Sequence, residues 1–150
     1  MNVKMSKFTF YFLSLTWGLP ITLLGILVAL VLLIAGKKPK RWGYCYYFEV
    51  GERWGGTELG IFFITDKTCG VHTKNHELGH AIQNCYFGPV MMPVISLPSF
   101  LRYWYRRIIV KIKKDKKLPP YDSIWFEGQA TRLGNEFMGW LKEKENKSSK

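Results

Sequence analysis

Cysteine is scarce in this chain of 150 residues, which contains only Cys45, Cys69 and Cys85. Three is an odd number, and the three positions do not have the close spacing of a cysteine zinc site. The sequence therefore excludes a disulfide framework and favours a reducing compartment. Each cysteine is expected to be an ordinary small residue of the core.

Charge is absent from residues 8–35, and no other part of the chain is uncharged over such a length. As a helix this run would be about 42 Å long, which exceeds the ~30 Å hydrocarbon core of a bilayer. A signal peptide has an apolar core of only about 7–15 residues, and this run is longer. We therefore predict a retained N-terminal membrane anchor, residues 1–36, with a single transmembrane helix that Pro20 divides.

Acidic residues are outnumbered two to one, with 11 against 22 lysines and arginines, so the net charge is +11. Basic residues are denser after the predicted span than before it, which predicts a cytoplasmic C-terminal domain. The segment 101–117 interleaves basic and apolar residues at helical spacing, as a membrane-surface helix does; a solvated helix face is the alternative. We expect an anionic lipid membrane as partner, and no nucleic acid.

Histidine is also rare, yet two of the three histidines stand in the segment His76-Glu77-Leu78-Gly79-His80. This H-E-x-x-H pattern falls in a predicted helix over residues 74–87, with Thr73 or Asn75 as its N-cap. Positions i and i+4 share a helix face, so both imidazoles can bind one Zn²⁺. Glu77 would lie beside the metal and act as general base. A polar helix face with two hydrogen-bonded histidines is the alternative.

A catalytic zinc site requires a third protein ligand. Tyr86 stands where one branch of H-E-x-x-H proteins has a third histidine, and His72 could reach the metal only through an unusual turn. The carboxylates after His80 are Asp115, Asp122, Glu127, Glu136, Glu143 and Glu145. Glu127 lies among apolar residues of a predicted helix and would need a partner if buried. We predict Glu127 as the third ligand; an exposed Glu127 is the alternative.

These motifs resemble those of zincin-type zinc metallopeptidases of the gluzincin kind, which add a glutamate from a later helix to H-E-x-x-H. The chain is also similar to small bacterial membrane proteins with H-E-x-G-H, a Pro-rich apolar stretch and a later E-x-x-A. The matching segments are 76–83, 88–99 and 127–134. The resemblance implies a zinc fold with a strand beside the motif helix. The chain departs from it at Thr131, where an E-x-x-x-D motif would have its aspartate, and no His or Tyr is marked as transition-state stabiliser.

The predicted fold class is α+β: an N-terminal transmembrane helix, a small zincin-like domain over residues 37–141, and a polar, frayed tail over 142–150. Strands at 41–50 and 59–65 are expected to form a hairpin before the motif helix. The Pro-rich stretch 86–101 dips into the membrane interface, packs as core, or enters and returns. Further helices are expected near 99–113, 123–134 and 136–145, the last of which could extend the one before it.

The favoured function is a membrane-anchored zinc metallopeptidase, with Glu77 as general base and a peptide or protein substrate that can itself be membrane-bound. Intramembrane proteolysis is disfavoured, because polar residues flank the histidines and no N-P-D-G motif follows. The alternative is a non-catalytic zinc-binding membrane module that binds lipid or a partner protein. Glu77 argues against it, because a structural zinc site needs a fourth ligand and no such base.

Overall fold

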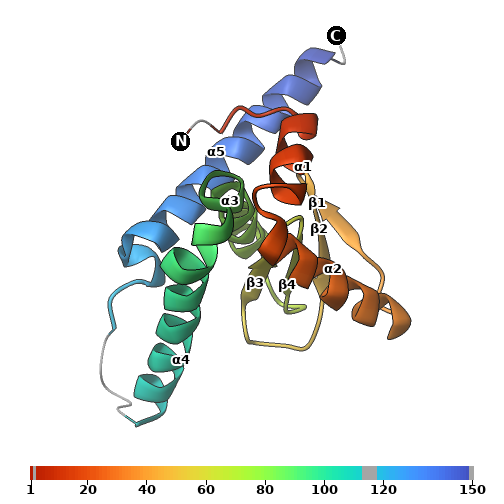
Figure 1. The fold of residues 1–150 in the computed structure, drawn as a ribbon. Coiled ribbons are helices and arrows are strands. Elements are labelled where there is room, and N and C mark those ends of the chain that lie inside the picture. Colours follow the sequence, from red (N-terminus) through yellow and green to blue (C-terminus); the bar gives the residue numbers. More distant parts are fainter. Residues whose placement is uncertain (2, 113–117, 149–150) are drawn as a thin grey trace.

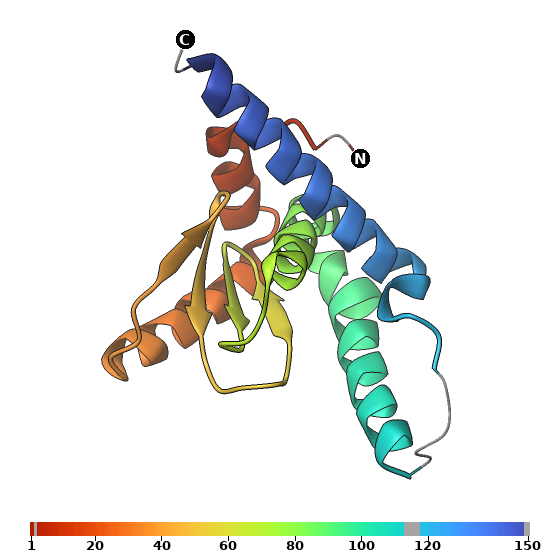
Figure 2. The ribbon, with the colours of Figure 1, turned by 180° about the vertical axis from the view of Figure 1, so that it is seen from behind.

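A computed structural model describes residues 1, 3–112 and 118–148 of the chain. Its elements are α1 (Lys7–Leu15), α2 (Leu19–Ile34), β1 (Lys40–Trp42), β2 (Cys45–Glu49), β3 (Gly56–Leu59), β4 (Phe62–Thr65), α3 (Val71–Phe87), η1 (Gly88–Val90), η2 (Met92–Ser96), α4 (Leu97–Ile112), η3 (Tyr121–Ser123) and α5 (Trp125–Ser148). The predicted α+β class agrees with this order. The motif helix α3 lies between the sheet and the long helix α5 (Figures 1 and 2).

The sheet has the strand order β1-β2-β4-β3, and its topology differs from the predicted hairpin. The predicted strand 41–50 covers most of β1, a turn and β2, and the predicted strand 59–65 contains β4. β2 and β4 pair in parallel, while β1 with β2 and β3 with β4 are the antiparallel pairs. Gly43 and Gly60 have positive φ angles of 57° and 74° and allow the two tight turns. The predicted strand 41–50 is therefore itself a hairpin, and the strand predicted at 59–65 is the second half of the β3–β4 hairpin.

The predicted single transmembrane helix is wrong. Residues 7–34 form α1 and α2, which are bent by 93° at a short break. Among the described residues no single helix is both long enough and apolar enough to cross a membrane, and only this bent pair passes when its members are taken together. The predicted cytoplasmic side of the C-terminal domain depended on the single span, and it stays a prediction.

Contacts with the rest of the fold hold the bend between α1 and α2. Asn84 of α3 donates from Nδ2 to the Gly18 carbonyl at 3.2 Å. Beyond the bend, α2 rests on the β3–β4 turn, where a Cβ at Gly25 would lie 2.0 Å from the carbonyl oxygen of Leu59. α1 packs on α3 and contributes Phe10 to the core shared with Leu78. The uncharged run is thus part of the packed domain.

The other helices differ from the prediction mainly in their bounds. α3 begins at Val71 after Gly70, so neither Thr73 nor Asn75 is its N-cap. α5 is continuous, so the helices expected at 123–134 and 136–145 are one, and the tail is helical as far as Ser148. The helix expected near 99–113 is α4; the rest of the basic segment, residues 113–117 with Asp115, lies outside the described residues.

The Pro-rich stretch forms η1, η2 and the start of α4. Its side chains Met91 and Ile95 are buried and pack with Ile21 of α2 and Phe126 of α5. Most of its other large apolar side chains are exposed, among them Val90 and Met92. Of the alternatives predicted for the Pro-rich stretch, packing as core therefore describes its buried side only.

The helices α3 and α5 approach each other through two glycines. A Cβ at Gly79 would lie 1.8 Å from the carbonyl oxygen of Ala130, and one at Gly134 would lie 1.8 Å from that of Asn75. Real Cβ atoms do not come so close to backbone, so each position requires glycine. Gly79 therefore allows the close approach of a neighbouring backbone and is not merely a tolerated helix glycine.

Gly134→Ala should lower the free energy of unfolding by about 1–3 kcal/mol or more, because its methyl group overpacks two helix backbones. Gly139→Ala in the same helix is the control, since a Cβ there meets nothing within 4 Å. That variant should gain about 0.5–1 kcal/mol, as expected when glycine leaves a helix interior. Thermal unfolding followed by circular dichroism measures both, and equal melting temperatures would contradict the close crossing.

Candidate metal centre

Three side chains from two helices converge between α3 and α5. The Nε2 atoms of His76 and His80 lie 3.0 and 3.2 Å from Oε2 of Glu127, and 3.1 Å from each other. Ligands at ~2.0–2.1 Å from a tetrahedral zinc would be roughly 3.3 Å apart, so the three atoms are close to metal-site spacing. All three residues are buried, and the group can hold a metal ion. The three predicted ligands are thus brought together.

The side chain of Gln83 determines which nitrogen of His80 carries the proton. Gln83 donates from Nε2 to the Phe126 carbonyl at 2.9 Å, which fixes the orientation of its amide group. Its Oε1, 2.7 Å from His80 Nδ1, must then be an acceptor, so His80 donates from Nδ1. A neutral His80 therefore presents the lone pair of Nε2 to Glu127.

Thr131 has the same role for His76. Its hydroxyl donates to Asp122 Oδ2 at 2.9 Å, and its oxygen lies 2.8 Å from His76 Nδ1. Because the hydroxyl proton is already directed to a carboxylate, the oxygen accepts from His76 Nδ1. The lone pair of His76 Nε2 therefore also points to the shared centre. Thr131, noted in the sequence as a missing aspartate, links His76 to an aspartate one hydrogen bond away.

These hydrogen bonds leave three electron-pair donors facing one point, an arrangement that requires a cation or protons. Glu127 Oε1 is also buried and has no hydrogen-bond partner among the described residues. With no cation present, protons on the two Nε2 atoms would form hydrogen bonds to Glu127. Burial raises the pKa of Glu127, but these hydrogen bonds from His76 and His80 outweigh it and hold that pKa well below its usual range. In that protonated, metal-free form, burial lowers the pKa of His80, yet the hydrogen bond to Glu127 and the nearby Glu77 raise it overall. The donor set therefore fits a metal cation.

Glu77 lies beside this group without belonging to it. The side chain is buried and packs against the start of β3, where a Cβ at Gly56 would lie 2.6 Å from Glu77 Oε1. Burial raises the pKa of Glu77, although His76 and His80 partly offset this. A carboxylate that binds a proton more readily than usual is suited to proton transfer.

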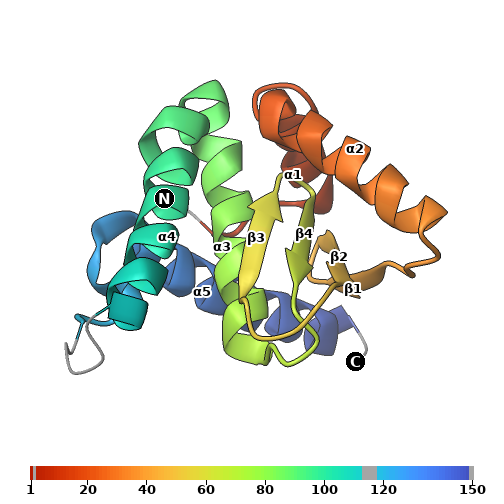
Figure 3. The ribbon, with the colours of Figure 1, turned by 90° about the horizontal axis from the view of Figure 1, so that it is seen from below.

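Both histidines of the group, and Glu77, line a cleft of about 400 Å³. Residues of β3 form one wall and residues of η2 and α4 form the other, with α3 between them (Figure 3). Lining residues include Gly56, Thr57, Glu58, Met91, Ile95, Ser99, Phe100 and Tyr103. Burial raises the pKa of Glu58 to about 8, since the backbone hydrogen bond from Gly60 only partly opposes it. A ligand that enters between β3 and α4 would therefore reach both histidines and Glu77.

Tyr121 stands at the edge of the cleft beside the metal group. Its ring is 6.1 Å from that of His76, and its hydroxyl oxygen is 3.3 Å from Ser99 Oγ. Burial and the neighbouring Glu127 carboxylate raise the pKa of Tyr121 above its usual value. The phenol therefore keeps its proton and can act as a hydrogen-bond donor.

Sequence reasoning missed the supporting residues Gln83, Asp122, Thr131 and Tyr121 as parts of the site. The contact between Gln83 and His80 could have been predicted, because the two residues are three apart on one helix. Tyr121 and Asp122 precede α5, and no periodicity marks them.

No protein-family model, curated protein or solved structure matches the chain. The site is therefore interpreted from its geometry, and the resemblance to zincin-type peptidases stays a prediction.

Thr131→Val should weaken metal binding by about 10–100-fold, because the variant cannot accept from His76 Nδ1. Thr131→Ser keeps the hydroxyl and should bind the metal as the unchanged chain does. Competition with a chromophoric chelator for Zn²⁺ measures all three affinities. A valine variant that binds as tightly as the serine variant would contradict the orienting role of this hydroxyl.

Proposed function

We propose that this chain is a zinc-dependent peptidase. His76, His80 and Glu127 hold Zn²⁺, and Glu77 is the general base. The observation that supports this most is the convergence of three lone-pair donors beside a cleft that both histidines line, next to a carboxylate that is not in the group. Two imidazole nitrogens and one glutamate oxygen form a ligand set that catalytic zinc uses.

The bound Zn²⁺ would supply Lewis-acid chemistry, lowering the pKa of a water molecule towards ~7 and polarising the substrate carbonyl. Glu77 takes the proton of the attacking water while the water oxygen bonds to the carbonyl carbon. The C–N bond then breaks, and Glu77 passes the proton to the leaving amine. The protonated phenol of Tyr121 is the candidate donor to the carbonyl oxygen.

Two features favour catalysis over a purely structural metal site. Structural zinc sites have four protein ligands, whereas the group found among the described residues has three. The cleft also leaves the group accessible to a substrate. A non-catalytic zinc-binding module would need neither the cleft nor Glu77.

Metal content tests the ligands. The purified chain should contain about one Zn²⁺, and His80→Ala should contain almost none, because two ligands hold zinc poorly where three are required. Glu127→Gln should also lose most of its zinc. Glu136→Gln is its matched control, since Glu136 lies exposed on the same helix. Elemental analysis measures each, and full zinc in His80→Ala would contradict the ligand assignment.

Activity tests the base. Glu77→Gln should keep its zinc and its fold but hydrolyse peptides at least about 100-fold more slowly, since general-base catalysis contributes about 10²–10⁴. A library of fluorogenic peptides is the probe, and Glu52→Gln, at an exposed turn, is the control. Equal rates for Glu77→Gln and the unchanged chain would exclude this mechanism. A zinc-loaded chain that cleaves no peptide would favour the non-catalytic module.

A further inference from the structure

The exposed large apolar side chains of the described residues are concentrated in two segments. One is α2, where Leu27, Leu30 and Val31 are 51–64% exposed. The other runs from η1 through α4, where Leu101 and Ile108 are 58% and 51% exposed and no residue of α4 is buried. Together these two segments, residues 19–34 and 90–112, form what we call the docking face.

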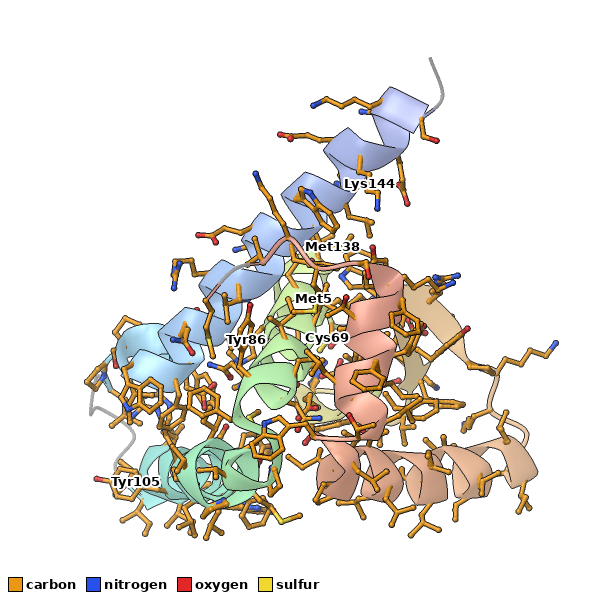
Figure 4. The ribbon with its side chains drawn as sticks, turned by 45° about the horizontal axis from the view of Figure 1, so that its top comes forward. Met5, Cys69, Tyr86, Tyr105, Met138 and Lys144 are labelled. Atoms are coloured by element: carbon orange, nitrogen blue, oxygen red, sulfur yellow. The ribbon has the colours of Figure 1, made fainter. Side chains whose placement is uncertain are left out.

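The docking face is on one side of the molecule. In Figure 4 α2 lies along the lower edge, and α4 lies at the same edge, seen nearly end-on, with Tyr105 pointing outward. Side chains of both helices extend away from the body in the same direction, while Lys144 of α5 lies at the opposite edge. Two helices that lie in one plane with apolar side chains outward present a flat apolar surface.

All charged residues within the two segments of the docking face are basic. Residues 1–48 and 78–114 contain no aspartate or glutamate, so every acidic residue lies outside the two segments. Lys37 and Lys38 follow α2, and α4 carries Arg107 and Lys111 on its exposed surface. Flat, apolar and positively charged, the face is complementary to an anionic bilayer surface.

We propose that the docking face binds the surface of an anionic lipid bilayer, with α2 and α4 lying in the interfacial plane. α2 has 16 residues, about 24 Å of helix, which is shorter than the ~30 Å hydrocarbon core. Its inner side, with Ile21 and Gly25, is occupied by the fold. Trp104 and Tyr105 are exposed on α4, and such rings favour the membrane–water interface.

A second copy of the chain fits the docking face less well. Two copies meeting through the same face would bring together lysines and arginines with no acidic partner, and like charges across an interface are unfavourable. The face also borders the cleft, because Phe100 is exposed and lines it. A bound bilayer would therefore lie next to the cleft. The proposal does not depend on metal binding or catalysis.

Flotation with vesicles tests the docking face. The full chain, diluted from mild detergent, should float with vesicles of phosphatidylcholine and phosphatidylglycerol, and less with phosphatidylcholine alone. Leu30→Gln with Leu101→Gln should weaken the partitioning at least about 100-fold, because each side chain loses the transfer of an apolar group from water. Val71→Gln, exposed on α3 outside the docking face, is the control and should float normally.

Charge is tested separately. Lys37→Gln with Lys38→Gln should reduce binding to the anionic vesicles by roughly 5-fold per lysine, with little effect on phosphatidylcholine. Lys142→Gln with Lys144→Gln, at the opposite edge, should change neither. A chain that does not float with anionic vesicles at low salt would overturn the proposal. So would docking-face variants that float normally, or self-association in solution that Leu30→Gln and Leu101→Gln abolish.

Discussion

The close crossing of α3 and α5 is the contact on which the metal centre depends. Gly79 and Gly134 each face a backbone carbonyl of the other helix, so the two helices are held at a distance that any side chain would increase. At this distance Glu127 reaches both histidine nitrogens with one oxygen. A larger separation would move the carboxylate away from the imidazoles and leave a buried charge without a partner, which is costly.

Residues outside the three ligands determine which nitrogen of each histidine carries the proton. Gln83 and Thr131 each accept from an Nδ1 of the motif histidines, and both are themselves oriented, by the Phe126 carbonyl and by Asp122. Their combined effect is that both Nε2 lone pairs point inward. The same two helices thus supply the ligands and the groups that orient them.

The helix α2 of the N-terminal run and the basic helix α4 lie at the same edge of the fold. Taken separately, one resembles a membrane span and the other a surface helix. The bend at Gly18 turns α2 across the β3–β4 turn, so that its outer side lies along the same edge as α4. Neither segment contains an acidic residue, so the charged side chains that they carry are all basic.

Local spacing in the sequence was enough to predict a helix carrying His76, Glu77 and His80, a basic amphipathic helix, and Glu127 as a carboxylate that needs a partner. These features repeat with the period of a helix or stand out by residue type. The bend at Gly18, the parallel pairing of β2 with β4, and the link from His76 through Thr131 to Asp122 were decided only by the tertiary structure. Each depends on contacts between different secondary-structure elements, which hydrophobic periodicity does not encode.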